Sequence, residues 1–143
     1  MEYKKLTHLS MFLALSIVLS ILESLLPLSG IIPGMKLGIA NIMIVLTLYL
    51  YGRKEAFFLS ILRVFLMGIL RTGLFSVTFF FSLIGAIFSI GIMALFYQSK
   101  LSIIGISILG SMFHSIGQMT TAIILLQIPN MIYYLPWMII LSI

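Results

Sequence analysis

The sequence contains neither cysteine nor aspartate. Without cysteine the chain cannot form disulfides, thiolate metal sites or a cysteine nucleophile. Its three acidic residues are too few for the clustered carboxylates that hold magnesium and a diphosphate, and the phosphate-binding loop G-x-x-x-x-G-K-[ST] is absent. With only three glutamates and two histidines, a serine–histidine–acid triad is also disfavoured. We therefore expect no catalytic residues, no metal site and no cofactor.

Charge is scarce and apolar residues dominate. Of 143 residues, 8% are charged and 62% are hydrophobic, whereas soluble domains carry about 25% and about 45–50%. This composition predicts an all-α integral membrane protein, a polytopic helix bundle that forms one domain over residues 1–143. Eight basic residues against three acidic ones give a net charge of +5. In a membrane protein such an excess marks cytoplasmic loops rather than nucleic-acid binding.

Breaks rich in glycine, proline or charge divide the chain into apolar runs that predict about six transmembrane helices. The predicted segments are residues 9–28, 36–51, 56–70, 74–97, 101–127 and 131–143. At about 1.5 Å per residue the last run covers only about 20 Å of a core about 30 Å thick. We expect that this last helix is truncated or only partly inserted.

The basic residues predict the orientation. Five of them fall on one side of the predicted bundle: Lys4, Lys5, Arg53, Lys54 and Lys100. Lys36 and Arg71 fall on the other side. Because basic loops stay in the cytoplasm, we expect a multi-pass protein of the cell membrane with a cytoplasmic N-terminus.

Polar residues inside the predicted helices indicate a ligand chamber, since ionisable groups in hydrocarbon are functional candidates by default. Those predicted to lie in the outer half are Glu23, Lys36, Asn41, Arg71, His114 and Gln118, with Arg63 deeper. In the fifth run, polar side chains recur on one helical face, at Ser107, Ser111, His114, Gln118 and Thr121. We expect this chamber to be positive, to suit a small polar or anionic solute, and to be gated by residues 30–34.

Structural roles are the alternatives for the same residues. Glu23 and Lys36 can form an ion pair that only orients two helices. Arg63 can extend its side chain toward the membrane surface, and His114 can form an ordinary hydrogen bond between helices. Ser16, Ser20 and Ser24 recur every fourth residue, so they predict a small-residue ridge for close helix packing.

The sequence resembles a known family, the Gx transporter family, which is also labelled heptaprenyl diphosphate synthase component I. The likeness extends over about residues 13–126. It rests on Pro33-Gly34-Met35-Lys36-Leu37-Gly38-Ile39-Ala40-Asn41, Arg53-Lys54-Glu55-Ala56, Ser82-Leu83-Ile84-Gly85-Ala86, Gly105-Ile106-Ser107-Ile108-Leu109-Gly110 and His114-Ser115-Ile116-Gly117-Gln118. Ser115 departs from the asparagine that the family pattern has at that position.

The resemblance implies a fold like that of the substrate-binding S components of energy-coupling-factor (ECF) transporters. It marks Lys36, Asn41, Arg63, His114 and Gln118 as motif positions. S components dock a transmembrane coupling subunit, which works with ATPases, through an A-x-x-x-A ridge on the first helix. Here Ser16, Ser20 and Ser24 offer a ridge without those alanines.

Three functions are consistent with these observations. The leading hypothesis is a membrane subunit that captures a small polar or anionic solute from outside and takes energy from partner subunits. The second is a noncatalytic membrane component of a heptaprenyl diphosphate synthase, in which the cytoplasmic basic residues matter most. The third is a scaffold subunit of a membrane redox chain, because the family is associated with loci for extracellular electron transfer.

Overall fold

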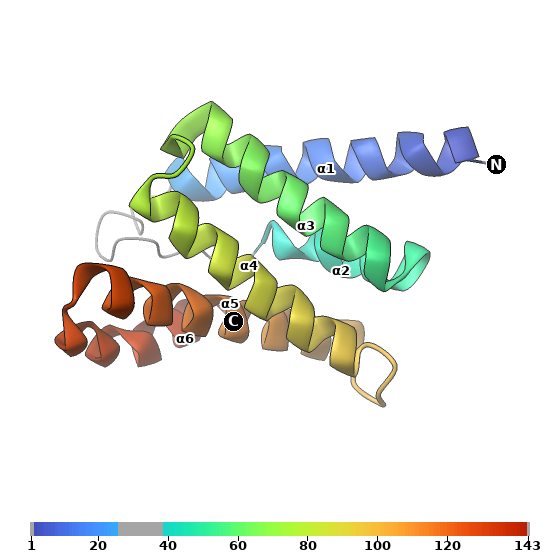
Figure 1. The fold of residues 1–143 in the computed structure, drawn as a ribbon. Helices are drawn as coiled ribbons and strands as arrows, with labels where there is room; N and C mark the ends of the chain where they lie inside the picture. Colours follow the sequence, from blue (N-terminus) through green and yellow to red (C-terminus); the bar gives the residue numbers. More distant parts are fainter. Residues whose placement is uncertain (1, 26–38, 143) are drawn as a thin grey trace.

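A computed structural model describes residues 2–25 and 39–142 of the chain. Within these ranges the structure is helical and contains no strand. Its elements, in chain order, are α1 (Glu2–Leu25), α2 (Asn41–Tyr51), α3 (Arg53–Met67), the π-helical turn η2 (Gly68–Thr72), α4 (Val77–Phe96), α5 (Ile103–Leu126), the 3-10 turn η3 (Pro129–Tyr134) and α6 (Leu135–Ser142). The predicted all-α class is confirmed. The helices lie in layers, with α1 at one side of the bundle and α5 and α6 at the other (Figure 1).

Within the described part of the chain, three helices are long and apolar enough to cross a membrane: Tyr3–Leu25, Val77–Phe96 and Ile103–Leu126. The shorter helix α2 is equally apolar, but its 11 residues span only about 16 Å. α6 has eight residues, because the segment predicted to be helical from residue 131 first forms the 3-10 turn η3 after Pro129. Of the six predicted spans, the three that begin at residues 9, 74 and 101 therefore correspond to described helices of membrane-crossing length.

Serine caps explain where α4 and α5 begin. Ser76 and Ser102 have extended backbones, and their hydroxyl groups accept hydrogen bonds from Phe79 N and Gly105 N, each at 3.1 Å. Such caps satisfy backbone N–H groups that lack a partner in the first helical turn. The predicted starts at residues 74 and 101 were three and two residues too early. Before α4, the chain turns at residues 73–75, where Gly73 and Phe75 have positive φ values of 81° and 62°.

The first predicted helix was too short at its N-terminus. α1 begins at Glu2 rather than at residue 9, so the polar segment before the apolar run is helical too. α1 packs against α2 and α3 alone among the described elements. Its exposed apolar side chains repeat every three or four residues at Met11, Leu15, Val18, Leu22 and Leu25. Such a face is suited to contact lipid.

α4 and α5 form the central helix pair. They approach closely because glycines face each other: a Cβ atom on Gly117 would lie 3.0 Å from Gly85 Cα. Small residues at a crossing let helix backbones come together in membranes. A separate apolar core joins α2, α3, α4 and α5 through Ile44, Leu48, Leu59, Ile90 and Ile106.

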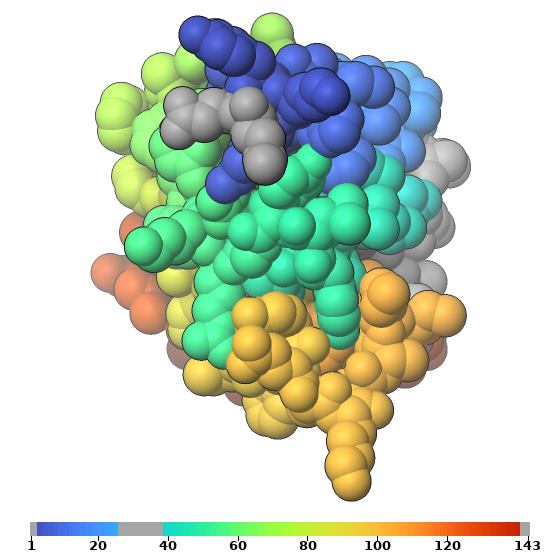
Figure 2. All heavy atoms as spheres, turned by 90° about the vertical axis from the view of Figure 1, so that its right-hand side faces the viewer, coloured from blue at the N-terminus to red at the C-terminus, as the bar shows by residue number. Residues whose placement is uncertain are grey.

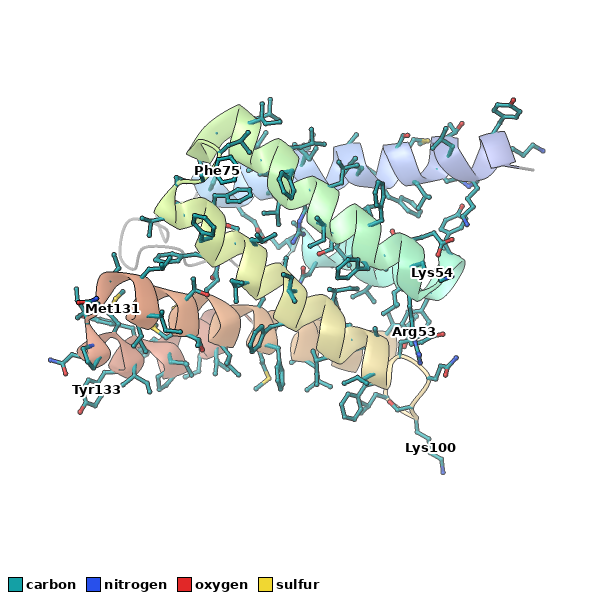
Figure 3. All side chains as sticks on the ribbon, viewed as in Figure 1. Arg53, Lys54, Phe75, Lys100, Met131 and Tyr133 are labelled. Atoms are coloured by element: carbon teal, nitrogen blue, oxygen red, sulfur yellow. The ribbon has the colours of Figure 1, made fainter. Side chains whose placement is uncertain are left out.

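One end of the bundle carries the basic residues predicted to be cytoplasmic. The start of α1, the α2–α3 turn and the α4–α5 connection meet at this end (Figures 1 and 2). Arg53, Lys54 and Lys100 lie there, whereas Phe75, Met131 and Tyr133 lie at the opposite end (Figure 3). Lys5 forms an ion pair with Glu55, and Arg53 lies over the Tyr97 ring with its guanidinium carbon 5.0 Å from the ring centroid. These contacts confirm that the predicted basic loops come together at one end.

Candidate functional site

The first residues of α2 are held by polar side chains from three other helices. α2 begins at Asn41, and the preceding residue, Ala40, provides no side-chain cap. Instead, Glu23 and Ser16 of α1 bond to the backbone of residues 39 and 40. Arg63 of α3 and Ser89 of α4 bond to the side chain of Asn41. All four side chains are at least nine-tenths buried. In an apolar bundle this is a concentrated set of polar groups.

Asn41 joins α3 to α4. Arg63 Nη2 donates a long hydrogen bond of 3.5 Å to Asn41 Oδ1, and Asn41 Nδ2 donates to Ser89 Oγ at 3.1 Å. The orientation of the amide follows from chemistry, because a guanidinium can only donate and must therefore face the amide oxygen. Ser89 accepts through its oxygen, which leaves its hydroxyl proton available for an acceptor.

Glu23 and Ser16 attach α1 to the same segment. The Glu23 carboxylate accepts a hydrogen bond from Ile39 N through Oε1, and Ser16 Oγ donates to Ala40 O at 3.4 Å. Glu23 and Arg63 thus both bond to the short segment at residues 39–41.

Arg63 keeps most of its hydrogen-bonding capacity. A guanidinium carries five N–H donors, and the side chain of Arg63 is only 7% exposed. Among the described residues it bonds to Asn41 alone, and no described carboxylate lies within 4.0 Å of it. A buried cation with unused donors can bind the oxygen atoms of a ligand.

The polar stripe on α5 faces the protein, as predicted. Ser111, His114, Gln118 and Thr121 are all at least nine-tenths buried, and Ser107 is half-buried. Ser111 and Thr121 donate to carbonyl groups of their own helix, at Ser107 O and Gly117 O. Gln118 differs, because its Nε2 atom is fully buried and has no hydrogen-bond partner among the described residues. A buried amide in this state costs about 1–3 kcal/mol and is suited to a ligand.

α4 connects the two groups of polar residues. Gly85 packs against His114 and Gln118: a Cβ atom there would lie 2.9 Å from Gln118 Cγ and 3.1 Å from His114 Cε1. Ser89, the partner of Asn41, is four residues further along α4 on the same face. One helical turn, about 6 Å, therefore separates the level of Gln118 from the level of Asn41. We name these residues together the polar cluster: Glu23, Asn41, Arg63, Ser89, His114 and Gln118.

The structure places the predicted site residues in three groups. Glu23, Asn41, Arg63, His114 and Gln118 are buried, and Arg63, expected to lie deeper than the others, is bonded to Asn41. Arg71 is exposed on η2 and is not part of the cluster. Lys36 and the proposed gating loop lie outside the described residues.

The serine ridge of α1 lies partly inside the fold. Ser16 is fully buried under the start of α2, whereas Ser20 and Ser24 are half-buried and donate to carbonyls of α1 itself. Ser89, which bonds to Asn41, was not among the predicted site residues. The signal available for it was its position four residues after Gly85, on one helical face.

The described residues contain no group of three histidine, cysteine or acidic side chains that could hold a metal ion. Among the described residues the cluster contains one guanidinium, one carboxylate, one imidazole, two amides and one hydroxyl group.

Residues 12–143 match the family described as heptaprenyl diphosphate synthase component I. This match confirms the resemblance recognised in the sequence motifs. Neither a curated protein nor a solved structure matches the chain.

Proposed function

Because the chain belongs to the heptaprenyl diphosphate synthase component I family, whose members resemble transporter S components, we propose that it is the solute-capturing membrane subunit of a transporter. In this role it takes up a small polar or anionic solute from outside and depends on partner subunits for energy. The observation that carries the proposal is Arg63, a buried cation whose only hydrogen bond to a described residue is the long one to Asn41.

The energetics of membranes support a functional role for these groups. An arginine at the centre of a membrane helix costs about 2.5–3.5 kcal/mol on insertion scales. A residue needed only for packing can be replaced by an apolar one of similar size, often without loss of stability. Burying Arg63, Asn41 and Gln118 in an apolar bundle costs free energy. A role in ligand binding explains why these polar residues are present.

The proposed topology has six membrane segments and a cytoplasmic N-terminus. α1, α4 and α5 cross fully, and α3 continued by η2 enters the membrane from Ala56 to Thr72, 17 residues that span about 26 Å. α2 returns the chain to the basic end, and α6 enters the membrane for part of its depth. The basic end then faces the cytoplasm of the cell membrane, as cytoplasmic loops do.

Energy has to come from partners, because the sequence has no phosphate-binding loop. By analogy with S components, these partners are a transmembrane coupling subunit and ATPases. Since Ser16 is buried, docking through the serine ridge would have to use Ser20 and Ser24, next to the exposed apolar face of α1.

The second candidate is a noncatalytic membrane component of heptaprenyl diphosphate synthase. The family description favours it, and so does the exposed basic end, where Arg53, Lys54 and Lys100 could bind a soluble synthase subunit. In this case the polar cluster would serve only to hold the helices together.

Native mass spectrometry of the full-length protein, purified in mild detergent from its own membranes, separates the two candidates. We expect a retained small molecule that is lost in Arg63→Gln, together with co-purifying coupling and ATPase subunits. Arg53→Gln is the matched control, because it removes the same charge from the exposed end. A protein without a small molecule that co-purifies with a prenyl synthase, and loses it in Arg53→Gln, would contradict the transporter proposal.

A further inference from the structure

The basic end carries more positive charge than the acidic side chains of the chain can balance. Its five basic residues are Lys4, Lys5, Arg53, Lys54 and Lys100. The whole sequence has three acidic residues, of which Glu23 is buried against the start of α2, away from this end. Glu55 is paired with Lys5. Even when Glu2 is counted with Glu55, five positive charges against two negative ones leave an excess of at least three.

Arg53 is fixed in place by neighbours from α4. Its guanidinium carbon lies 5.0 Å from the centroid of the Tyr97 ring, and its Nη2 atom donates a long hydrogen bond of 3.5 Å to Gln98 Oε1. Tyr97 is supported in turn by Tyr49, which it meets edge-on with the ring centroids 6.0 Å apart. A guanidinium has five N–H donors, so most of those of Arg53 remain available for an anion.

Two lysines lie next to this arginine. Lys54 follows Arg53 directly, and Lys100 comes two residues after Gln98, at most about 7 Å along the chain. Both lysines are exposed, and neither has a carboxylate within 4.0 Å among the described residues. Figure 2 looks onto this end, where the α2–α3 turn and the α4–α5 connection lie next to each other. One anion between them can therefore bind cations from both connections.

Exposed apolar side chains adjoin the same cations. Phe58 lies four residues after Lys54, on the same face of α3, and is 68% exposed. On α5, Leu101 follows Lys100 and Ile104 lies one turn further on, where it is 72% exposed. The three cations therefore border an apolar surface on one side and water on the other. This combination suits a ligand with an anionic head and an apolar body.

We propose that Arg53, Lys54 and Lys100 form a binding site for the phosphate group of an anionic phospholipid. In the proposed topology α4 and α5 cross the membrane, so the connection between them lies at the level of the lipid headgroups. The acyl chains would lie along the exposed apolar side chains of α3 and α5. This inference goes beyond the proposed function, since it needs only the membrane crossing of α4 and α5 and not a captured solute.

The chemistry of the site favours this occupant over three others. The headgroup of a zwitterionic phospholipid brings a cation of its own, which the excess positive charge repels. Inorganic phosphate gains nothing from the neighbouring apolar side chains. A soluble acidic protein reaches the cations from water, but the apolar side chains beside them face the membrane. Basic clusters next to membrane helices attract anionic lipids by about 1 kcal/mol per cation.

Native mass spectrometry of the full chain in a neutral detergent, with lipid added in known amounts, tests the proposal. The probes are dioleoyl phosphatidylglycerol, dioleoyl phosphatidylcholine with the same acyl chains, and inorganic phosphate. We expect phosphatidylglycerol to bind about tenfold or more tightly than phosphatidylcholine, and inorganic phosphate not to displace it. The preference should shrink as salt is added, because the cations are exposed.

Lys100→Gln is the main variant, because Lys100 makes no hydrogen bond or ion pair with a described residue that its loss would break. It should weaken phosphatidylglycerol binding by about fivefold and leave phosphatidylcholine binding unchanged. Arg53→Gln should weaken it by at least as much. Arg71→Gln is the matched control, since it removes an exposed arginine from η2, at the other end of α3, and should leave the preference unchanged. Unaltered Tm values without lipid show that each variant is folded.

Four results would overturn the lipid site. Equal affinity for the two phospholipids would show that no headgroup is recognised, and an equal loss in Arg71→Gln would show that net charge alone attracts the lipid. Displacement of phosphatidylglycerol by inorganic phosphate would assign the cations to a free anion. A soluble prenyl synthase that co-purifies with the chain and is lost in Lys100→Gln, without any preference between the phospholipids, would assign them to a protein partner.

Discussion

Replacing Gly85 by alanine adds one methyl group at the closest approach of α4 and α5. The new Cβ atom would lie 2.9 Å from His114 O and from Gln118 Cγ, distances that real Cβ atoms essentially never show. His114 O belongs to the backbone of α5 and cannot rotate away, so the two helices must separate or shift. Gln118, the side chain with the unused buried amide, must move too.

The size of the effect follows from two opposing terms. Overpacking of a tight interior costs about 1–3 kcal/mol, whereas glycine to alanine inside a helix gains about 0.5–1 kcal/mol. We expect a net loss of about 1–2 kcal/mol, or a decrease in Tm of about 4–8 °C for a chain of this size. We also expect weaker solute binding, because Gln118 is displaced.

Gly91 provides the matched control on the same helix. No atom lies within 4 Å of a Cβ built there. Gly91→Ala should therefore show only the stabilisation due to the higher helix propensity of alanine, and raise Tm by about 2–4 °C. Thermal unfolding in detergent, followed by intrinsic fluorescence, measures both variants. Equal Tm values for Gly85→Ala and Gly91→Ala would refute the close crossing of α4 and α5.

Three further predictions concern single contacts. Asn41→Ala leaves Arg63 and Ser89 without their shared partner. The free energy of unfolding, measured by chemical denaturation, should therefore fall by about 1–3 kcal/mol. An unchanged free energy of unfolding would mean that the amide does not bridge α3 and α4. Ser102→Ala removes the cap of α5 and should lower the free energy of unfolding by about 1 kcal/mol. Ser102→Asp, which can also cap the helix, should keep the wild-type stability. An aspartate variant as unstable as the alanine variant would argue against capping. The hydrogen bond from Lys5 lowers the pKa of Glu55 below its ordinary value of 4.5, so its stabilising contribution is complete above that pH and is lost as the pH falls through the lowered pKa. Tm plotted against pH across this range should therefore be flatter for Glu55→Gln than for the wild type. Identical plots for the two proteins would contradict the ion pair.

The sequence was sufficient for the class of fold and for the buried face of α5. Sixty-two per cent hydrophobic residues with few charges permit little besides membrane helices. The spacing of Ser111, His114 and Gln118 defines one helical face regardless of neighbours, and burial confirms that this face meets protein. The basic residues, too, meet at one end as their loop positions predicted.

The contacts around α2 could not be predicted from local patterns. That Glu23, Arg63 and Ser89 meet at residues 39–41 depends on how four helices pack, which helical periodicity does not encode. The ends of the helices depended on weaker signals: Ser76 is an ordinary cap, but the positive φ of Phe75 has no marker in the sequence. The spacing of the serines on α1 could not tell an exposed docking ridge from a packing contact. Ser16 is buried inside the fold and does not lie on an exposed ridge.

The central claim is that the polar cluster binds a solute that enters from outside. Since the chain has no cysteine, Ser89→Cys creates a single reactive probe in the cluster. Intact cells should label this cysteine with a small, membrane-impermeant thiol reagent, and bound solute should slow the reaction. Ser99→Cys, at the exposed basic end, should react only in inverted vesicles. A Ser89→Cys protein that stays unlabelled from both sides, while its unfolded form reacts, would show that the cluster only packs helices together.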